Sequence, residues 1–236
     1  MTLTLLLDLD DTLIQNSAHT FLPAYLQAWG EFMAPRYNPQ RFSQALLLAT
    51  QAMAEHPRPD QTLRQSFNQA FYPLLETDPL TFLPCEDEFY RSIFPIIKSV
   101  TRPVDGVVSF IETAFQRGYR VAIATNPFFP LTAIQQRLAW AGLPVERYPY
   151  ALVPAIETFH FGKPHPAYFA EFLAQMGWPD GPVVMVGNDY EMDILPADQL
   201  GLATFWITPN GEPAPKALRM PHQSGQLGDL LTWLDQ

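Results

Sequence analysis

Residues Leu3–Ile14 read LTLLLDLDDTLI, and the rest of the chain can be interpreted outward from this stretch. Residues 4–7 form a largely apolar run with the length of a buried strand, and Asp8, Asp10 and Asp11 follow it within four positions. Like charges at the tip of a buried strand repel one another and destabilise the protein unless a cation lies close to them. The sequence must therefore supply positive charge at this strand end.

Two later segments repeat the pattern of an apolar run that ends abruptly in a small or polar residue. They are residues 121–124 before Thr125 and residues 183–186 before Gly187, and residues 202–207 are a further strand candidate. Short apolar runs that alternate with helix-like stretches indicate βαβ units, in which a parallel sheet is buried on both faces. We therefore expect an α/β fold with a Rossmann-like parallel sheet core and helices on both faces.

The chain between the first and second of these strands has a different character. Three segments in it, HTFLPAYLQAWGEFMA, RFSQALLLATQAMAEH and QTLRQSFNQAFYPLL, carry apolar residues at the spacing of amphipathic helices. We expect a small α-helical cap domain at residues 16–102, inserted into a core domain formed by residues 1–15 and 103–236. Residues 209–225, which hold four prolines and two glycines, are expected to be loop.

The composition limits the classes of partner and compartment. The 236 residues include 14 basic and 24 acidic side chains, a net charge of -10, without a Lys/Arg cluster, so nucleic acid is not expected as a partner. The single cysteine, Cys85, excludes an intramolecular disulfide. The N-terminal apolar run is too short for a signal peptide or a membrane span. We expect a cytoplasmic protein without a membrane partner; the sequence does not indicate its oligomeric state.

Polar residues at three strand ends are expected to meet, because ligands of an open parallel sheet bind outside the carboxyl ends of its strands. These residues are Asp8 and Asp10, then Thr125 and Asn126, and finally Asn188, Asp189 and Asp193. Carboxylate oxygens and waters are the ligands that Mg²⁺ prefers. Lys163, one of three lysines, lies among aromatic residues in FHFGKPHPAYFAEFL, where it needs a carboxylate or phosphate partner.

In this order, these residues resemble the four motifs of the haloacid dehalogenase (HAD) superfamily of phosphotransferases. The matches are Asp8, Asp10 and Thr12 in DxDxT, Thr125 at the end of VAIAT, Lys163 in GKPHP, and the acids of VVMVGNDYEMD. The insertion after the first motif resembles the helical cap that closes over the site in many small-molecule HAD phosphatases.

The resemblance implies a catalytic role for four residues. Asp8 corresponds to the nucleophile that forms an aspartyl-phosphate, and Asp10 to the general acid that protonates the leaving oxygen and then activates water. Thr125 corresponds to a hydroxyl donor to the phosphoryl group. Lys163 corresponds to the cation that neutralises this group and holds Asp8 ionised. Asn126 and Thr12 are expected to bind the substrate.

The resemblance also implies a Mg²⁺ site formed by Asp8, the Asp10 backbone carbonyl and a carboxylate of the fourth motif. That motif departs from its commonest form, because Asn188 follows the strand and the acid comes one residue later. We expect Asp189 to be the metal ligand and Asp193 a second carboxylate that acts through water or on the lysine. The amide oxygen of Asn188 is the alternative ligand.

Asp10 indicates which branch of the superfamily the chain belongs to. The resemblance implies phosphoryl transfer, because the dehalogenase branch, which attacks carbon, does not keep an acid two residues after the nucleophile. We therefore expect a Mg²⁺-dependent phosphatase of small phosphorylated metabolites, a HAD-like phosphoric monoester hydrolase. The alternatives are a phosphomutase or a phosphonatase, for which Lys98 is the only lysine available in the cap, and a catalytically retired HAD domain that acts as a binding module.

Overall fold

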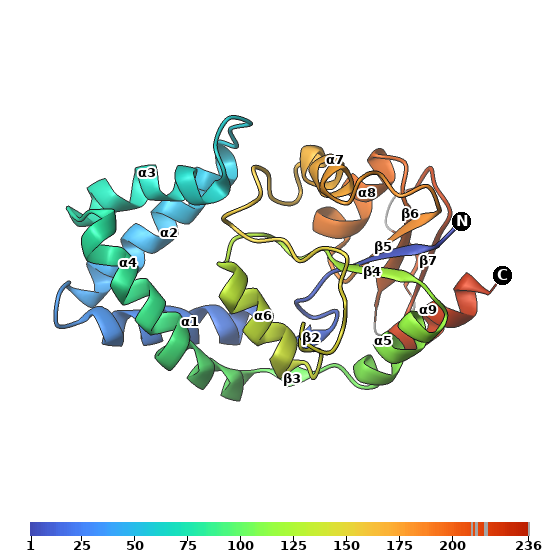
Figure 1. The fold of residues 1–236 in the computed structure, drawn as a ribbon, viewed down its shortest axis with the longest axis horizontal. Coiled ribbons are helices and arrows are strands. Elements are labelled where there is room, and N and C mark those ends of the chain that lie inside the picture. The colour runs from blue at the N-terminus through green and yellow to red at the C-terminus, as the bar shows by residue number, and fades with distance from the viewer. Residues whose placement is uncertain (209, 211, 215–216, 236) are drawn as a thin grey trace.

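A computed structural model describes residues 1–208, 210, 212–214 and 217–235. Its centre is a five-stranded sheet in the order β4–β1–β5–β6–β7, with all neighbouring strands parallel (Figure 1). The strands are β1 (Thr4–Leu7), β4 (Arg120–Ile123), β5 (Val183–Gly187), β6 (Ala203–Ile207) and β7 (His222–Gly225). The predicted α/β fold with a parallel sheet is confirmed.

The position of β1 in the sheet explains the opening stretch of the sequence. Thr4 of β1 pairs with Arg120 of β4 on one side and with Val183 of β5 on the other. Residues 5–7 are completely buried, which explains why this strand has no polar alternation. Because β4, β1 and β5 are neighbours and parallel, their carboxyl ends lie together at one edge of the sheet.

The expectation that residues 209–225 form only loop is wrong at their C-terminal end. His222–Gly225 forms β7, an edge strand whose residue His222 pairs with Thr204 of β6. The sequence HQSG has no apolar pattern, since this strand is set by backbone hydrogen bonds to β6 and not by burial of its side chains. Pro209, Gly211, Pro215 and Lys216 lie outside the described residues.

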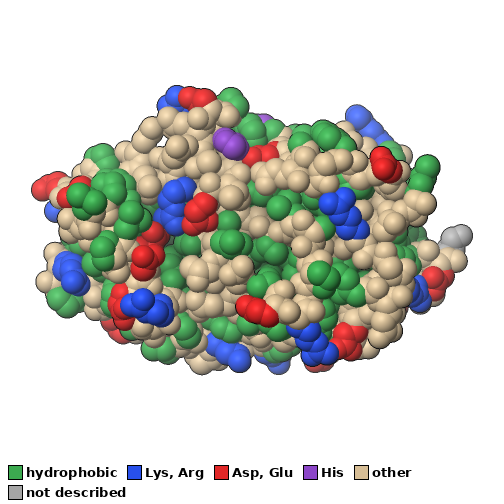
Figure 2. Space-filling model, viewed as in Figure 1, with side chains coloured by type: hydrophobic (Ala, Val, Ile, Leu, Met, Phe, Trp, Pro, Cys, Tyr) green, Lys and Arg blue, Asp and Glu red, His purple; other side chains and the backbone are tan. Residues whose placement is uncertain are grey.

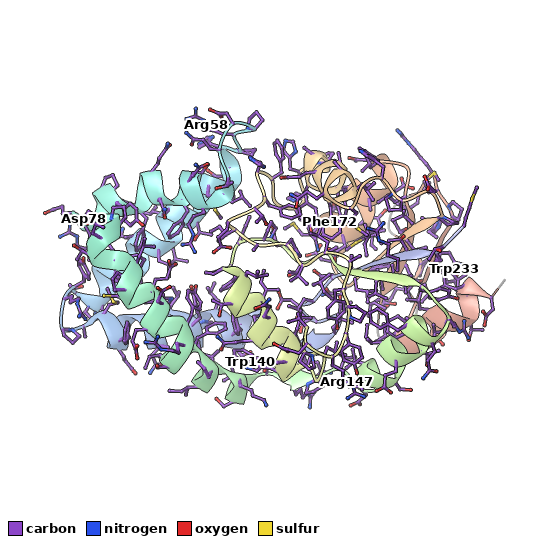
Figure 3. The ribbon with its side chains drawn as sticks, in the orientation of Figure 1. Arg58, Asp78, Trp140, Arg147, Phe172 and Trp233 are labelled. Carbon is purple, nitrogen blue, oxygen red and sulfur yellow. The ribbon has the colours of Figure 1, made fainter. Side chains whose placement is uncertain are left out.

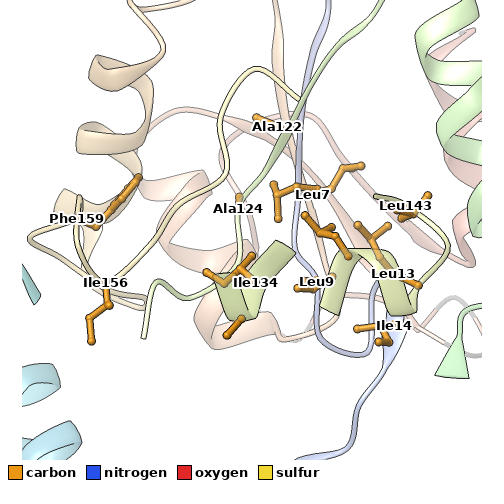
Figure 4. Close-up of a cluster of buried hydrophobic side chains, with 14 of the residues drawn as sticks. Leu7, Leu9, Leu13, Ile14, Ala122, Ala124, Ile134, Leu143, Ile156 and Phe159 are labelled. Carbon is orange, nitrogen blue, oxygen red and sulfur yellow. The ribbon is translucent and has the colours of Figure 1, made fainter. Parts of the chain in front are cut away.

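Helices cover the sheet on both sides. Figure 1 shows α7 and α8 on one side of it and α5 and α9 on the other. The helices of the core are α5 (Val107–Gln116), α6 (Leu131–Trp140), α7 (Pro166–Gln175), α8 (Leu195–Gln199) and α9 (Leu227–Leu234), with a short π-helix η3 (Tyr190–Ile194) directly before α8. Apolar side chains of β1, of the turn after it and of α6 pack together under the strand ends (Figure 4). This packing fixes the strand tips that carry Asp8 and Thr125.

The inserted segment is helical, and standard capping residues set where its helices begin. It contains α1 (Ala18–Met33), α2 (Pro39–Glu55), α3 (Leu63–Leu75), α4 (Pro79–Glu88), the π-helix η1 (Phe89–Ile93) and the 3₁₀-helix η2 (Phe94–Val100). Side chains of Ser17, Asn38, Thr62 and Asp78 accept backbone hydrogen bonds at the starts of α1 to α4. Proline stands at the first position of α2 and α4, where it leaves no amide unsatisfied.

A short antiparallel pair joins this helical segment to the core. Ile14 of β2 (Ile14–Gln15) pairs with Pro103 of β3 (Arg102–Pro103). We propose that the two domains divide here, and residues 16–102 are called the cap below. The aromatic residues of the cap fill its interior: Trp29 is 2% exposed and stacks on Phe89 with ring centroids 3.6 Å apart.

Candidate active site

Three charged side chains from distant parts of the chain meet in a buried cluster. Nζ of Lys163 donates hydrogen bonds to Oδ1 of Asp8 at 2.7 Å and to Oδ1 of Asp193 at 2.6 Å. The exposed fractions of the three side chains are 3%, 9% and 3%. The structure therefore brings together the residues that the sequence predicts as nucleophile, lysine and second fourth-motif acid; this set is called the buried triad below.

Local backbone structure explains how the buried triad forms. Asp8 follows β1, Lys163 precedes α7, and Asp193 lies in η3, just after β5. Gly187, the last residue of β5, has to be glycine, because a Cβ atom there would overlap the carboxylate of Asp193. The freed space lets Asp193 fold back toward the strand, where its Oδ2 accepts a hydrogen bond from the Asp189 amide at 3.1 Å.

The buried triad holds two carboxylates against one ammonium group. Burial lowers the pKa of Lys163, but the nearby Asp193 and Asp8 carboxylates outweigh it and raise that pKa above its usual value. Burial raises the pKa of Asp193, partly opposed by Lys163 and reinforced by the charge of Asp8. When all three groups are ionised, one negative charge is left without a partner in a buried site. A bound cation would offset it.

Asp10 lies beside the buried triad and is held by an arginine that sequence reasoning missed. Its Oδ1 accepts hydrogen bonds from the guanidinium of Arg137 and from the Asn16 amide group. Arg137 lies on α6 and is 1% exposed; burial lowers its pKa to about 10, which leaves it charged at neutral pH. A sequence signal existed, because Arg137 stands three residues after Ile134, on the apolar face of α6.

Asp11 takes no part in the cluster. It has a left-handed backbone conformation with φ of 53°, and its carboxylate accepts a hydrogen bond from the backbone N–H of Asn16 at 2.8 Å. Asp11 thus closes the turn that leads into the cap, which matches the tolerance of aspartate for this conformation.

The predicted phosphate-binding residues lie at the tips of β4 and β1. Thr125 is buried, and its carbonyl accepts the hydroxyl hydrogen of Tyr168, another residue that sequence reasoning missed, at 2.9 Å. Oδ1 of Asn126 accepts the amide hydrogen of Lys163 at 3.2 Å. Gly162 allows this approach, because a Cβ there would stand 2.7 Å from that oxygen. These contacts attach the loop after β4 to the segment that carries the lysine.

In the fourth motif, the side-chain amide of Asn188, and not the carboxylate of Asp189, lies next to the first motif. Oγ1 of Thr12 donates a hydrogen bond to Oδ1 of Asn188 at 3.2 Å. Asp189 is exposed, and its Oδ1 accepts the amide hydrogens of Glu191 and Met192, both at 3.0 Å, at the start of η3. The structure does not bring the Asp189 carboxylate into contact with the buried triad.

The donor set at the strand ends suits a magnesium ion. Among the described residues no three His, Cys, Asp or Glu side chains form a cluster that could hold a metal ion without other donors. The carboxylates of Asp8 and Asp193, the Asp10 carbonyl and the Asn188 amide oxygen are all hard oxygen donors at the same sheet edge. Mg²⁺ commonly binds to one or two carboxylates and keeps several waters. The surplus negative charge of the buried triad fits such an ion.

A cleft of about 970 Å³ opens beside the site. Its lining includes Asp11, Thr20, Arg102, Asn188 and Thr208, which come from the first turn, the cap, the connection between the domains and the strand ends. A cleft of this size and polarity admits a small molecule. Acidic and basic side chains are scattered over the face shown in Figure 2. Across the described residues, every helix is too short or too polar to cross a membrane.

The chain belongs to the haloacid dehalogenase-like hydrolases, since the model of that family matches residues 2–201. A curated relative, the pyrimidine 5′-nucleotidase YjjG of Escherichia coli (strain K12), is 34% identical over 121 residues. That match covers 50% of this chain and 51% of the nucleotidase, so the chain is matched to only about half the length of that relative.

Solved structures of similar fold span the whole chain. A HAD phosphatase from Thermococcus onnurineus is 18% identical, covers 99% of this chain and 98% of its own, and has a TM-score of 0.59. A 2-haloacid dehalogenase from Pseudomonas syringae pv. Tomato DC3000 is 20% identical, covers 100% and 99%, and has a TM-score of 0.66. The putative HAD-hydrolase YfnB from Bacillus subtilis, bound to magnesium, is 19% identical, covers 100% and 99%, and has a TM-score of 0.56. At these identities the likeness shows the fold alone, which phosphatases and dehalogenases share.

Proposed function

We propose that this protein is a Mg²⁺-dependent phosphatase that hydrolyses small phosphate monoesters through an aspartyl-phosphate. One observation carries the proposal: Asp8 lies against Lys163 in the buried triad, and Asp10 stands two residues further on with a part-exposed carboxylate. A dehalogenase needs the nucleophile and the lysine, but its halide leaving group needs no proton. In a phosphatase, by contrast, the carboxyl group of Asp10 can protonate the alkoxide that departs.

The first half of the reaction follows from the contacts of Asp8. Lys163 binds Oδ1 of Asp8, which leaves Oδ2 to attack phosphorus. As the new bond between Oδ2 and phosphorus forms, the ester bond breaks and the leaving oxygen takes a proton from Asp10. Lys163 and donors at Thr125 and Asn126 stabilise the charge on the phosphoryl oxygens.

In the second half, Asp10 takes a proton from a water molecule, and that water attacks phosphorus. The bond between phosphorus and Asp8 then breaks, which releases inorganic phosphate and restores the carboxylate. Asp8, the Asp10 carbonyl, Asp193 and Asn188 would hold the magnesium ion. When bound, the ion shields the negative charges of the phosphate and the carboxylate that attacks it.

Two other functions receive less support from the structure. A phosphonatase-type reaction requires a lysine that reaches the substrate, and Lys98, the only cap lysine, is exposed at the end of η2. A retired binding domain would have no use for the unbalanced charges of the buried triad, which reduce stability. A phosphatase and a phosphomutase share the first half of the reaction.

Substrates are expected to be small phosphorylated metabolites, because residues of the cap and of the core together line a cleft of about 970 Å³, a size that suits a small molecule. The relative YjjG is a pyrimidine 5′-nucleotidase, so 5′-nucleotides are the first compounds to test as substrates of this chain.

Hydrolysis of an aryl phosphate, measured with Mg²⁺, with a chelator and with Asp8→Asn, tests the proposal. We expect activity that needs Mg²⁺ and falls at least about 10⁴-fold in Asp8→Asn, as for loss of a covalent nucleophile. Activity that survives both treatments would overturn the mechanism, and inactivity of the wild-type protein on all phosphate esters would favour a binding module. A panel of 5′-nucleotides and sugar phosphates then defines the substrate.

A further inference from the structure

The most conspicuous charged group outside the predicted motifs is the guanidinium of Arg137. Among the described residues its one hydrogen-bond partner is Asp10, and its Nε is buried without a partner. Burying a guanidinium costs far more free energy than burying an apolar side chain of similar length. Part of the hydrogen-bonding capacity of the guanidinium is therefore unused. The need to pair the arginine does not explain why this residue is buried on α6. Its contact with Asp10 does.

Two aromatic rings from different domains hold the guanidinium. Its Cζ lies 5.1 Å from the ring centroid of Phe21, in α1 of the cap, and 5.3 Å from that of Phe129, in the core loop that follows Asn126. The two rings also contact each other, with centroids 6.0 Å apart. Arginine stacks on aromatic faces through its planar cation. The orientation of Arg137 therefore depends on the cap as well as on the core.

At the other end of this contact, one oxygen of Asp10 is fixed and the other is left available. Arg137 and Asn16 both donate to Oδ1, and no donor among the described residues binds Oδ2. The Asp10 side chain is 42% exposed, whereas that of Arg137 is 1% exposed. The two donors thus hold the carboxylate by its inner oxygen and turn the outer oxygen toward the accessible side.

We propose that Arg137 is a positioning residue that orients Asp10 for proton transfer to the leaving group, and that Phe21 of the cap holds Arg137 in this orientation. This inference rests on the proposed phosphatase function. It makes correct placement of the acid depend on a docked cap, because removal of Phe21 would expose one face of the guanidinium to water and weaken its fixed geometry.

Leaving groups of different acidity provide the test in the first half of the reaction, because a misplaced acid slows that step only when the departing oxygen needs a proton. In Arg137→Met we expect the single-turnover rate of leaving-group release to fall about 100-fold for an alkyl phosphate and less than about 5-fold for p-nitrophenyl phosphate, whereas steady-state kcat falls for both, because Asp10 also activates the water of the second half. Arg137→Lys, which keeps the charge without the planar fork, should fall between wild type and Arg137→Met.

The cap side of the proposal has its own variants. Phe21→Leu should lower kcat for the alkyl phosphate about 10-fold, and Phe21→Tyr, which keeps the ring, should restore it. Arg147→Met is the matched control, because this arginine lies at the surface of the core with a 60% exposed side chain (Figure 3). It should not change either rate.

Crystal structures of wild type and Arg137→Met give a readout independent of activity. We expect the Asp10 carboxylate to turn away from its wild-type position in the variant, and if Arg137→Met does not fold, Arg137→Lys takes its place. Equal losses of the single-turnover rate of leaving-group release on both phosphates, or an Asp10 that stays in place, would overturn the inference. If the wild-type protein hydrolyses no phosphate ester, the proposed function fails, and the position of Asp10 in the two structures still decides whether Arg137 orients it.

Discussion

Two regions of the molecule bury charged side chains, and they differ in charge balance. In the core, the buried triad sets two carboxylates against Lys163. In the cap, Arg64 binds Glu86 at 2.7 Å and Glu157 of the core at 3.0 Å. Glu157 is partly exposed and easily solvated, so Arg64 and Glu86 form a nearly neutral pair. The core cluster keeps an unneutralised charge that the cap cluster does not.

The surroundings of the two clusters match this difference. The Arg64 pair lies near the hydrogen-bonded hydroxyls of Tyr25 and Tyr90, and the Arg64 amide also donates to the Ile156 carbonyl of the core at 2.8 Å. The contacts of Arg64 with Glu157 and Ile156 fasten the cap to the core. The buried triad instead lies at the strand ends of the core sheet, and both clusters adjoin a cavity, of about 970 Å³ beside the triad and about 240 Å³ at the Arg64 pair. A buried charge with a full set of partners indicates a structural role, whereas one that lacks a counter-charge indicates that a ligand supplies it.

Loss of the cation from each cluster should give the largest contrast. Lys163→Met leaves Asp8 and Asp193 without their cation, and uptake of a proton by Asp193, whose pKa burial raises, relieves only part of the cost, so we expect a loss of about 3–5 kcal/mol in the free energy of unfolding and at least about 10³-fold in kcat. Arg64→Met should cost about 1–3 kcal/mol and change kcat less than about 5-fold, because Glu86, whose pKa burial raises, can take up a proton. Urea unfolding and phosphate release measure both. Similar losses of kcat in the two variants would contradict the distinction.

Substitutions in the fourth motif test the proposed binding of Mg²⁺ at the core cluster. Asn188→Ala should raise the Mg²⁺ concentration for half-maximal activity by about 10- to 100-fold, because the amide oxygen is placed next to Thr12. Asp189→Asn is the matched variant and should change it less than about 3-fold, since that carboxylate caps η3. Calorimetric titration with Mg²⁺ gives the affinities directly. A larger effect of Asp189→Asn would indicate that Asp189, the ligand expected from the sequence, binds the metal.

The fourth motif also shows where sequence reasoning stops. Apolar runs predicted the strands, because β1, β4 and β5 are buried on both faces, and the order of the motifs predicted that Asp8, Lys163 and Asp193 come together. The choice between Asn188 and Asp189 depends on the turn after β5, where a one-residue shift decides which side chain faces the site. No periodicity encodes that shift.

Two further features depended on partners distant in sequence. β7 consists of polar residues whose strand conformation follows from pairing with β6, so it carries no local signal. Arg137 has its partner 127 residues away, at Asp10. A charged residue on an apolar helix face could have been noticed, but its partner could not have been named. Local patterns predict elements and motifs, and long-range pairs need the fold.

Neutralising one acid in each cluster should change stability in opposite directions. Asp8→Asn leaves Lys163 and Asp193 as a balanced pair, so we expect the free energy of unfolding to rise by about 1 kcal/mol even though activity is lost. Glu86→Gln removes the buried counter-charge of Arg64 and should lower it by about 1–2 kcal/mol. Thermal and urea unfolding without added metal measure both. Destabilisation by Asp8→Asn would mean that the buried triad is balanced as it stands.

The smallest expected effect concerns the tyrosines beside the cap pair. Burial raises the pKa of Tyr25 to about 12, above its ordinary value of about 10. The folded state therefore binds this proton more tightly than the unfolded chain, so the stability that Tyr25 contributes is complete below about pH 10 and is lost as the pH rises toward about 12. Between about pH 9 and about pH 10.5 the loss amounts to somewhat less than about 1 kcal/mol, and Tyr25→Phe should remove that part of the pH dependence. Urea unfolding at several alkaline pH values, with Tyr119→Phe as a control at a more exposed tyrosine, measures it. An identical pH dependence in wild type and Tyr25→Phe would show that the cap cluster is open to water, which would remove its contrast with the core.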